Sequence, residues 1–297
     1  MFRFFLTAAL LLTSISVLAT DLIQHTVQSN GHPMALWEKS VSNPKGHILL
    51  LHGRTWSALP DFDLQVEGES LSLMDGFNEL GYSTWALDAR GYGQTPRDSS
   101  GWNTPDKAAE DVANILAWLT ERTGNTTNLF GWSLGSMVAQ LTSQNHPALI
   151  NCVILYGYPI DPKVVIEETI GPTEPAREQN TARNAASDFI TRGSISEHAI
   201  QTYVEVSLKA DPVRADWTSR HQWNQLDAAQ INIPTLLLQG ELDPLTNSAS
   251  DARFFVSLPN AHKQWVLLKG GDHAALLETP RVRLLEATVN FIEWIDK

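Results

Sequence analysis

Gly131-Trp132-Ser133-Leu134-Gly135 stands between an apolar run at residues 127–130 and a helical pattern that follows it. This arrangement predicts a strand, a sharp turn with the serine at its tip, and a helix. The glycines are needed because side chains at those positions would collide with neighbouring backbone in so tight a turn. A strand that leads directly into a helix is the repeating unit of a parallel sheet, so this stretch decides the fold class.

The rest of the chain repeats this rhythm. Apolar runs that predict strands lie at residues 47–51, 82–87, 153–155, 235–238 and 264–268. Between them, a helix is expected from Thr104 as N-cap, with Pro105 in its first turn and Gly124 closing it. A last helix is expected over residues 280–295. The sequence therefore predicts an α/β fold with a mostly parallel central sheet flanked by helices.

Residues 160–231 interrupt the alternation, because they contain helical patterns and no convincing strand. We interpret them as a helical cap, or lid, inserted into a core made of residues 20–159 and 232–297. The alternative is a packed helical layer with no role at the site.

The first 19 residues form a separate pattern. Arg3 precedes apolar residues 4–12 and 15–18, and small residues stand at Val17 and Ala19. These features are typical of a cleaved signal peptide and predict a secreted or periplasmic protein. The alternative is an uncleaved membrane anchor, but the apolar stretch is short and interrupted by polar residues. No membrane span is expected in the mature chain.

The formal net charge is −12 and becomes −13 when removal of the leader takes Arg3 away. Such a surface disfavours nucleic acid and anionic membranes as partners. Cys152 is the only cysteine, so no intrachain disulfide and no cysteine-based metal site can form. It stands in an apolar run, where a buried, inert thiol is expected. The sequence predicts neither a metal nor a cofactor.

Three residues form a candidate catalytic set. A serine hydroxyl is a weak nucleophile until a positioned base removes its proton, and a third group must hold that base. His273 follows the last predicted strand and Asp243 follows the one before it. We predict Ser133 as nucleophile, His273 as base and Asp243 as acid, with Asp161 and the weaker Glu241 as alternative acids.

With these residues the chain resembles a capped member of the α/β-hydrolase superfamily, whose triad follows the order Ser, Asp, His. Leu51-His52-Gly53 resembles the family's His-Gly turn. The resemblance implies that the backbone N–H groups of Arg54 and Leu134 form the oxyanion hole. Residues 88–93 resemble the family's D-x-R-G-x-G loop, in which Asp88 and Arg90 are scaffold residues.

Departures from relatives narrow the expected reaction. Serine at the elbow argues against dehalogenase and epoxide hydrolase chemistry, where relatives carry aspartate. The chain lacks the His-Gly-Gly-Pro-Gly stretch of proline iminopeptidases, and Leu134 stands where haloperoxidases usually have methionine. Hydrolysis of an ester, lactone, thioester or amide remains, and we favour an ester or lactone. The alternatives are a secreted binding protein with a non-catalytic hydrolase fold and a C–C bond hydrolase with the same triad.

Four tryptophans are candidates for contact with substrate, although tryptophan is more often a core residue: Trp56, Trp132, Trp217 and Trp223. With the acidic net charge, they predict a largely apolar, neutral or cationic small-molecule substrate, such as a macrolactone.

Overall fold

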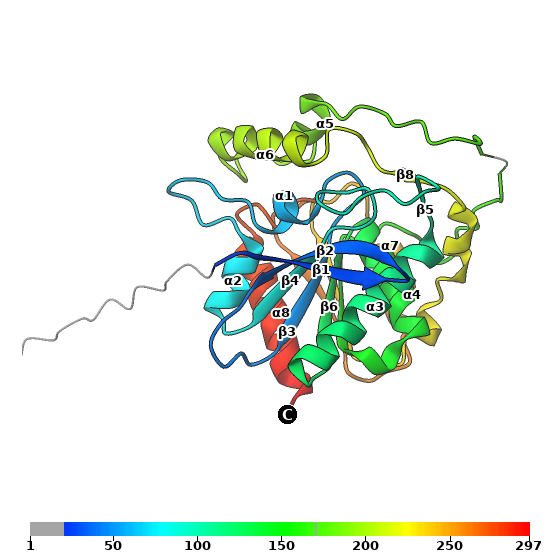
Figure 1. Ribbon diagram of the computed structural model, residues 1–297. Helices are drawn as coiled ribbons and strands as arrows, with labels where there is room; N and C mark the ends of the chain where they lie inside the picture. Colours follow the sequence, from blue (N-terminus) through cyan, green and yellow to red (C-terminus); the bar gives the residue numbers. More distant parts are fainter. Residues whose placement is uncertain (1–20, 170) are drawn as a thin grey trace, which may run out of the picture.

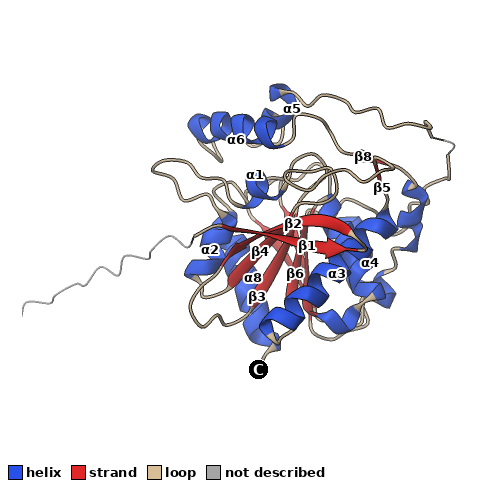
Figure 2. Ribbon diagram, viewed as in Figure 1, coloured by secondary structure: helices blue, strands red, loops and turns tan. Residues whose placement is uncertain are grey.

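The computed structural model describes residues 21–169 and 171–297. An eight-stranded sheet lies at its centre, with strand order β1-β2-β4-β3-β6-β7-β9-β10 (Figures 1 and 2). The strands are β1 (Ile23–Ser29), β2 (His32–Lys39), β3 (His47–Leu51), β4 (Ser83–Leu87), β6 (Thr127–Trp132), β7 (Ile150–Tyr156), β9 (Thr235–Gly240) and β10 (Lys263–Leu268). β2 runs antiparallel to both of its neighbours, and all other adjacent pairs are parallel.

Helices cover both faces of this sheet. They are α1 (Ala58–Phe62), α2 (Leu73–Glu79), α3 (Pro105–Thr123), α4 (Leu134–Asn145), α7 (Ser248–Ser257) and α8 (Arg281–Ile295). Two further helices, α5 (Ala182–Ala186) and α6 (Glu197–Ala210), belong to residues 160–231. In β3, Ile48 and Leu50 join the core under α1, α2 and α8, whereas Leu49 and Leu51 join the core under α3 and α4. A strand buried on both faces needs an unbroken apolar run, and for this reason the central strands were predictable.

Helix α3 shows how local chemistry sets an element's limits. The Lys107 N–H donates to the Thr104 hydroxyl, Pro105 opens the helix, and Gly124 closes it in the left-handed region at φ 76°. The expected helix, its cap residues and the six expected strands are all present. The fold class is confirmed.

The two strands at one edge of the sheet, β1 and β2, were not predicted. β1 alternates exposed polar and buried residues, and β2 contains Pro33 and charged Glu38 and Lys39. An edge hairpin of this kind lacks the continuous apolar run of a central parallel strand.

Within residues 160–231, α5 and α6 sit above α1, beyond the carboxyl ends of the parallel strands (Figure 1). The last part of the segment runs down the side of the core, where the Gln144 side chain at the end of α4 donates to the Gln225 carbonyl. The segment also contains two short 3₁₀ turns, η2 (Arg220–Gln225) and η3 (Ala228–Gln230). Contrary to the expectation of no strand, a two-residue strand, β8 (Asp216–Trp217), pairs with β5 (Trp102–Asn103) of the core. So short a strand has no periodicity that sequence could reveal.

The predicted leader, residues 1–19, lies outside the described residues. In residues 21–169 and 171–297, every helix is too short or too polar to span a bilayer.

Candidate active site

Ser133 stands at the turn between β6 and α4. Its backbone has φ 55° and ψ −118°, a conformation that costs energy for any residue with a side chain. A Cβ on Gly131 would collide with the carbonyl of Gly135, and a Cβ on Gly135 would collide with the carbonyl of Leu51. The Ser133 N–H donates to the carbonyl oxygen of Tyr156 on β7 at 2.9 Å. The turn is therefore held by packing on two neighbouring strands, and it lifts the serine off the sheet.

His273 and Asp243 meet at the ends of the last two strands. His273 Nδ1 lies 2.8 Å from Asp243 Oδ2, and the Asp243 side chain is fully buried. The other carboxylate oxygen of Asp243 accepts the Leu245 N–H at 2.8 Å. The indole N–H of Trp132 donates to the backbone oxygen of His273 at 2.7 Å, which ties the histidine loop to the serine turn. Gly157 leaves room for the imidazole, since a Cβ there would lie 3.0 Å from His273 Cε1.

The two alternative acids have other partners. Asp161 forms an ion pair with Arg253, and the hydrogen bond from this guanidinium lowers the pKa of the carboxyl. Glu241 accepts the Gly270 N–H at 2.8 Å. Neither hydrogen-bonds to His273, so the geometry favours Asp243 over both.

The predicted oxyanion-hole residues flank the serine. Leu134 is the first residue of α4, and the Gly53 backbone before Arg54 packs against Ser133, where an added Cβ would lie 3.7 Å from the serine Cβ. His52 braces this turn, with Nδ1 2.8 Å from the Gly53 carbonyl and Nε2 accepting the Ala89 N–H at 3.1 Å. Burial lowers the pKa of His52 to about 4, so this imidazole is neutral and structural.

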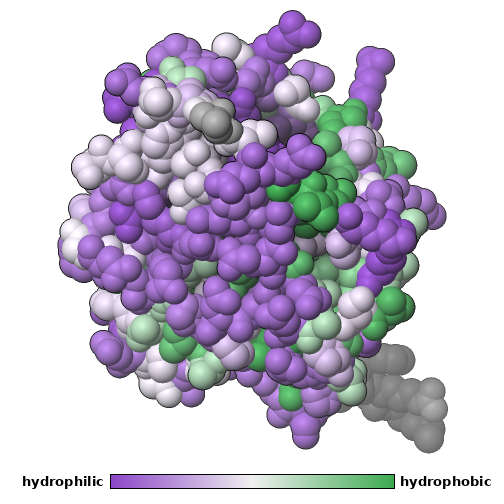
Figure 3. All heavy atoms as spheres, turned by 90° about the vertical axis from the view of Figure 1, so that its right-hand side faces the viewer, coloured by the Kyte–Doolittle hydropathy of each residue, from purple (hydrophilic) through white to green (hydrophobic). Residues whose placement is uncertain are grey.

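A cavity of about 530 Å³ opens above the serine. It is lined by every predicted site residue except Asp243: Ser133, His273, Arg54, Leu134, Trp56, Trp132, Trp217 and Trp223. Trp217 stacks on Trp223 with ring centroids 6.2 Å apart. Exposed Val164 and Leu245 add apolar surface to the lining. On the face shown in Figure 3, mostly hydrophilic surface surrounds a compact group of hydrophobic side chains.

Two carboxyl groups in the cavity wall were not predicted from the sequence: Asp61, which is buried, and Asp188, which is partly buried. The Tyr203 hydroxyl lies 3.0 Å from Asp61 Oδ1 and 3.3 Å from Asp188 Oδ2, and Asp188 also accepts the Trp56 indole N–H. A hydroxyl has a single hydrogen, so the two carboxyls are best satisfied when one of them is protonated. Burial raises the pKa of Asp61 well above its usual value and that of Asp188 to about 6. No local pattern marks either residue.

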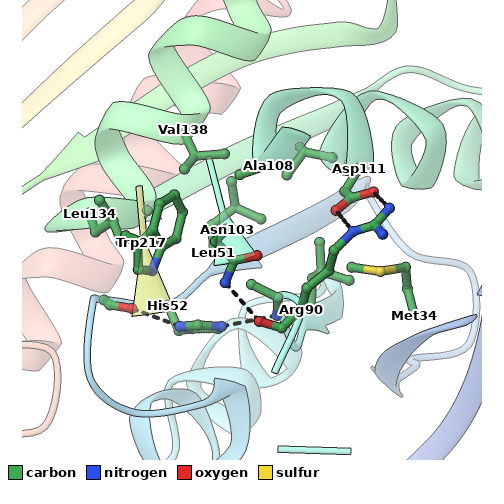
Figure 4. A pocket seen from close by; sticks show the side chains of 15 residues that line it. Met34, Leu51, His52, Arg90, Asn103, Ala108, Asp111, Leu134, Val138 and Trp217 are labelled. Atoms are coloured by element: carbon green, nitrogen blue, oxygen red, sulfur yellow. Dashed lines mark hydrogen bonds and ion pairs between the residues drawn. The ribbon is translucent and has the colours of Figure 1, made fainter. Parts of the chain in front are cut away.

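A second, much smaller cavity of about 30 Å³ lies beside this site (Figure 4). Arg90 crosses its wall and binds both carboxylate oxygens of Asp111, at 2.6 and 2.7 Å. Asp88 is buried and accepts N–H groups from Trp37, Ala58 and Gln94. Both residues hold loops together, in agreement with the scaffold role implied by the resemblance.

Among residues 21–169 and 171–297, no group of three or more His, Cys, Asp or Glu side chains is arranged to hold a metal ion.

A serine on a strained strand-to-helix turn, with a His–Asp pair at the ends of two parallel strands, defines the class of α/β-hydrolases. A sequence profile described as "Serine aminopeptidase, S33" matches residues 42–280, and the chain belongs to this family of hydrolases. A comparison with curated proteins gives no match.

Solved structures share the fold at low sequence identity. An alpha/beta hydrolase fold protein from Chitinophaga pinensis is 17% identical, with a TM-score of 0.65 over 92% of this chain and 98% of that one. The thioesterase domain from the curacin biosynthetic pathway is 16% identical, with a TM-score of 0.62 over 93% and 100%. An epoxide hydrolase from Vigna radiata is 16% identical, with a TM-score of 0.64 over 92% and 98%.

Proposed function

We propose that this hydrolase cleaves a carboxylic ester or lactone through an acyl-enzyme intermediate on Ser133. The observation that carries the proposal is the contact between His273 Nδ1 and the buried Asp243, because His273 lines the same cavity as the strained serine. A carboxylate on Nδ1 holds the histidine in the tautomer whose Nε2 can accept a proton.

The reaction follows from this arrangement. The Ser133 oxygen attacks the carbonyl carbon while its proton passes to His273 Nε2, and the carbonyl oxygen gains a negative charge. We propose that the N–H groups of Arg54, in the loop after β3, and of Leu134, at the start of α4, stabilise that charge. Collapse of the intermediate breaks the bond to the leaving alcohol, which takes the proton from His273. Water then attacks the acyl-enzyme by the same route and regenerates the serine.

The cavity lining supports a bulky and largely apolar substrate. Four tryptophans contribute to it, and we propose that residues 160–231 act as a cap that supplies Trp217 and Trp223. A macrolactone is one example of such a substrate. At long range, the net charge favours neutral or cationic molecules, whereas side chains at the cavity decide binding itself. The leader-like residues 1–19 support a secreted or periplasmic location.

The test is turnover of a panel of esters, lactones, thioesters and amides by the leaderless protein, with labelling by a fluorophosphonate and mass spectrometry. Amino-acid anilides belong in the panel because the same triad cleaves amides and the family description names an aminopeptidase. Ester turnover and labelling at Ser133 alone are expected.

Ser133→Ala should lower kcat by about 10³–10⁶-fold with the fold intact. Ser143→Ala is the matched control, because this buried α4 serine donates to the carbonyl of Ala139 at 2.7 Å and lies outside the cavity lining. Labelling at another residue, or near-normal turnover by Ser133→Ala, would refute the assignment. An inert panel with no labelling would favour the non-catalytic binding protein.

A further inference from the structure

Three arginines gather at the cavity, and two of them line it. Arg54 lies in the loop after β3, and Arg220 is the first residue of η2. Arg214 approaches from the same inserted segment as Arg220, and its Nη2 donates to the hydroxyl of Thr55, the residue next to Arg54, at 3.3 Å. Two regions far apart in the sequence thus direct guanidinium groups to one part of the site.

None of the three has a carboxylate within ion-pair distance among residues 21–169 and 171–297. Four arginines elsewhere pair with acids: Arg90 with Asp111, Arg97 with Asp216, Arg122 with Glu38 and Arg253 with Asp161. Others, such as Arg183 and Arg192, have no acid at that distance among the described residues, but they are exposed to solvent. With 33 acidic residues against 21 basic ones, partners are not scarce. What needs explanation is therefore that three unpaired arginines gather at the same site.

The surroundings of Arg54 are unfavourable for positive charge. Burial lowers the pKa of Arg54, and the charges of Arg214 and Arg220 lower it further, against smaller opposing effects that include Glu178. The Nε of Arg214 is buried and has no hydrogen-bond partner. A buried donor without a partner costs about 1–3 kcal/mol. An anion bound beside the guanidinium groups would offset their mutual repulsion.

The nearby acids do not fill this role. Asp188 is hydrogen-bonded to Trp56 and Tyr203, and Asp61 to Tyr203 and the Gly53 N–H. Asp161, also in the cavity wall, is held by Arg253. Each of these acids thus has hydrogen-bond partners of its own, although the charge of Arg214 also acts on Asp188 and opposes the rise in its pKa that burial causes.

We propose that Arg54, Arg214 and Arg220 form an anion subsite that binds an oxyanion group, carboxylate or phosphate, on the non-reacting part of the substrate. The proposal rests on the proposed function, and it narrows the substrate class to esters or lactones that carry a negative charge. Guanidinium groups bind either oxyanion through paired N–H donors. Because Arg54 follows the turn that packs on Ser133, the anion binds close to the reacting carbonyl.

This preference is opposite to the one that the net charge predicts. Screening limits the field of distant charges to about 8 Å at physiological salt, so three guanidinium groups in contact outweigh a diffuse surface charge of the other sign. The net charge slows the approach of an anion, and the subsite holds it after arrival.

The test compares p-nitrophenyl esters whose acyl chains have equal length and end in carboxylate, phosphate, carboxamide or ammonium. We expect kcat/KM for the carboxylate or phosphate ester to exceed that for the carboxamide ester by about 10-fold or more, mainly through KM. High salt should reduce this ratio. The better of the two anionic esters identifies the oxyanion.

Arg214→Gln and Arg220→Gln should each bring the ratio close to one. Arg183→Gln is the matched control, because Arg183 is exposed on α5 and outside the cavity lining, and it should keep the wild-type ratio. If the carboxamide or ammonium ester is preferred by the wild type, or if the preference survives in both variants, the anion subsite is wrong. The proposed function is tested separately, by turnover of the carboxamide ester and its loss in Ser133→Ala.

A binding measurement tests the anion subsite without relying on catalytic activity. Calorimetry on Ser133→Ala with a non-hydrolysable amide analogue should give a Kd about 10-fold lower for the carboxylate-ended form than for the carboxamide-ended form. Combining Ser133→Ala with Arg220→Gln should abolish this difference. Equal Kd values in Ser133→Ala would overturn the proposal.

Discussion

The cavity has two walls of different construction. The strand wall carries Ser133, Asp243 and His273 at the ends of β6, β9 and β10, where each backbone is fixed by the sheet and the side chains are mostly buried. The inserted wall, residues 160–231, presents Trp217 and Arg220 from two-residue strands, 3₁₀ turns and loops (Figure 1). Groups that must meet within tenths of an ångström stand on the rigid wall, whereas groups that select a substrate stand on the wall that can vary without disturbing the sheet.

The largest difference in kcat is expected between variants of two aspartates, Asp243 of the strand wall and Asp161 of the inserted wall. Asp243→Asn should lower kcat by about 10⁴-fold, because the amide can leave the imidazole in the wrong tautomer. Asp161→Asn, which removes a partly exposed ion pair with Arg253, should change kcat by less than about 10-fold. Ester kinetics on both variants check this, with circular dichroism to confirm folding. The reverse pattern would move the acid to the segment after β7.

Next in size is the predicted oxyanion donor on the strand wall. Arg54→Pro removes the N–H and should cost about 10²–10³-fold in kcat on a small neutral ester. Arg54→Ala keeps the donor and should lose far less on the same ester. Equal and severe losses in both variants would mean that the guanidinium itself acts on the reacting group, and the division between the two walls would fail at this residue.

A smaller effect, on KM, is expected from the inserted wall. Trp217→Ala removes an indole that stacks on Trp223 and should raise KM for bulky esters by about 10-fold, since burial of an aromatic side chain contributes about 1–2 kcal/mol. kcat should stay within about 3-fold, while Trp217→Phe retains a ring and should restore most of the affinity. Steady-state kinetics on long and short acyl esters distinguish the outcomes. A fall in kcat as large as that of Asp243→Asn would contradict the comparison.

The smallest effect concerns a carboxyl group that joins the two walls. Glu278 Oε1 accepts the Ser194 hydroxyl at 2.6 Å, and burial raises the pKa of Glu278 to about 8. The folded protein therefore holds this proton more tightly than the unfolded chain does. The free energy of unfolding should fall as pH rises from the unfolded pKa through about 8, by at most about 1.4 kcal/mol per pH unit.

Glu278→Gln should flatten this fall between about pH 5 and 8, measured by urea unfolding. Glu286→Gln, on the exposed side of α8, is the control and should behave as the wild type. If the Glu278 variant and the wild type lose stability in parallel, another group is responsible for the pH dependence.

The strand wall could be predicted from the sequence, whereas most of the rest of the cavity could not. The central strands and α3 could be predicted because burial on both faces demands apolar runs and because caps leave local signatures such as Thr104 and Gly124. The triad candidates could be predicted because chain order places them at strand ends. Asp188 and Arg214 could not, since only long-range packing brings them to the cavity and nothing beside them in the sequence marks that destination.

The glycines of the serine turn bear on how such a protein can diverge. Gly131 and Gly135 are confined by backbone carbonyls of the turn and of β3. A mutation can replace a neighbouring side chain with a smaller one, but it cannot remove a backbone carbonyl. A mutation at either position has no compensating second mutation nearby, whereas a change in the apolar core is accommodated by repacking. Proteins of this fold can therefore diverge in most of their side chains and in the inserted wall while these two glycines remain fixed. The geometry of the serine turn is then preserved because no Cβ is tolerated at either position.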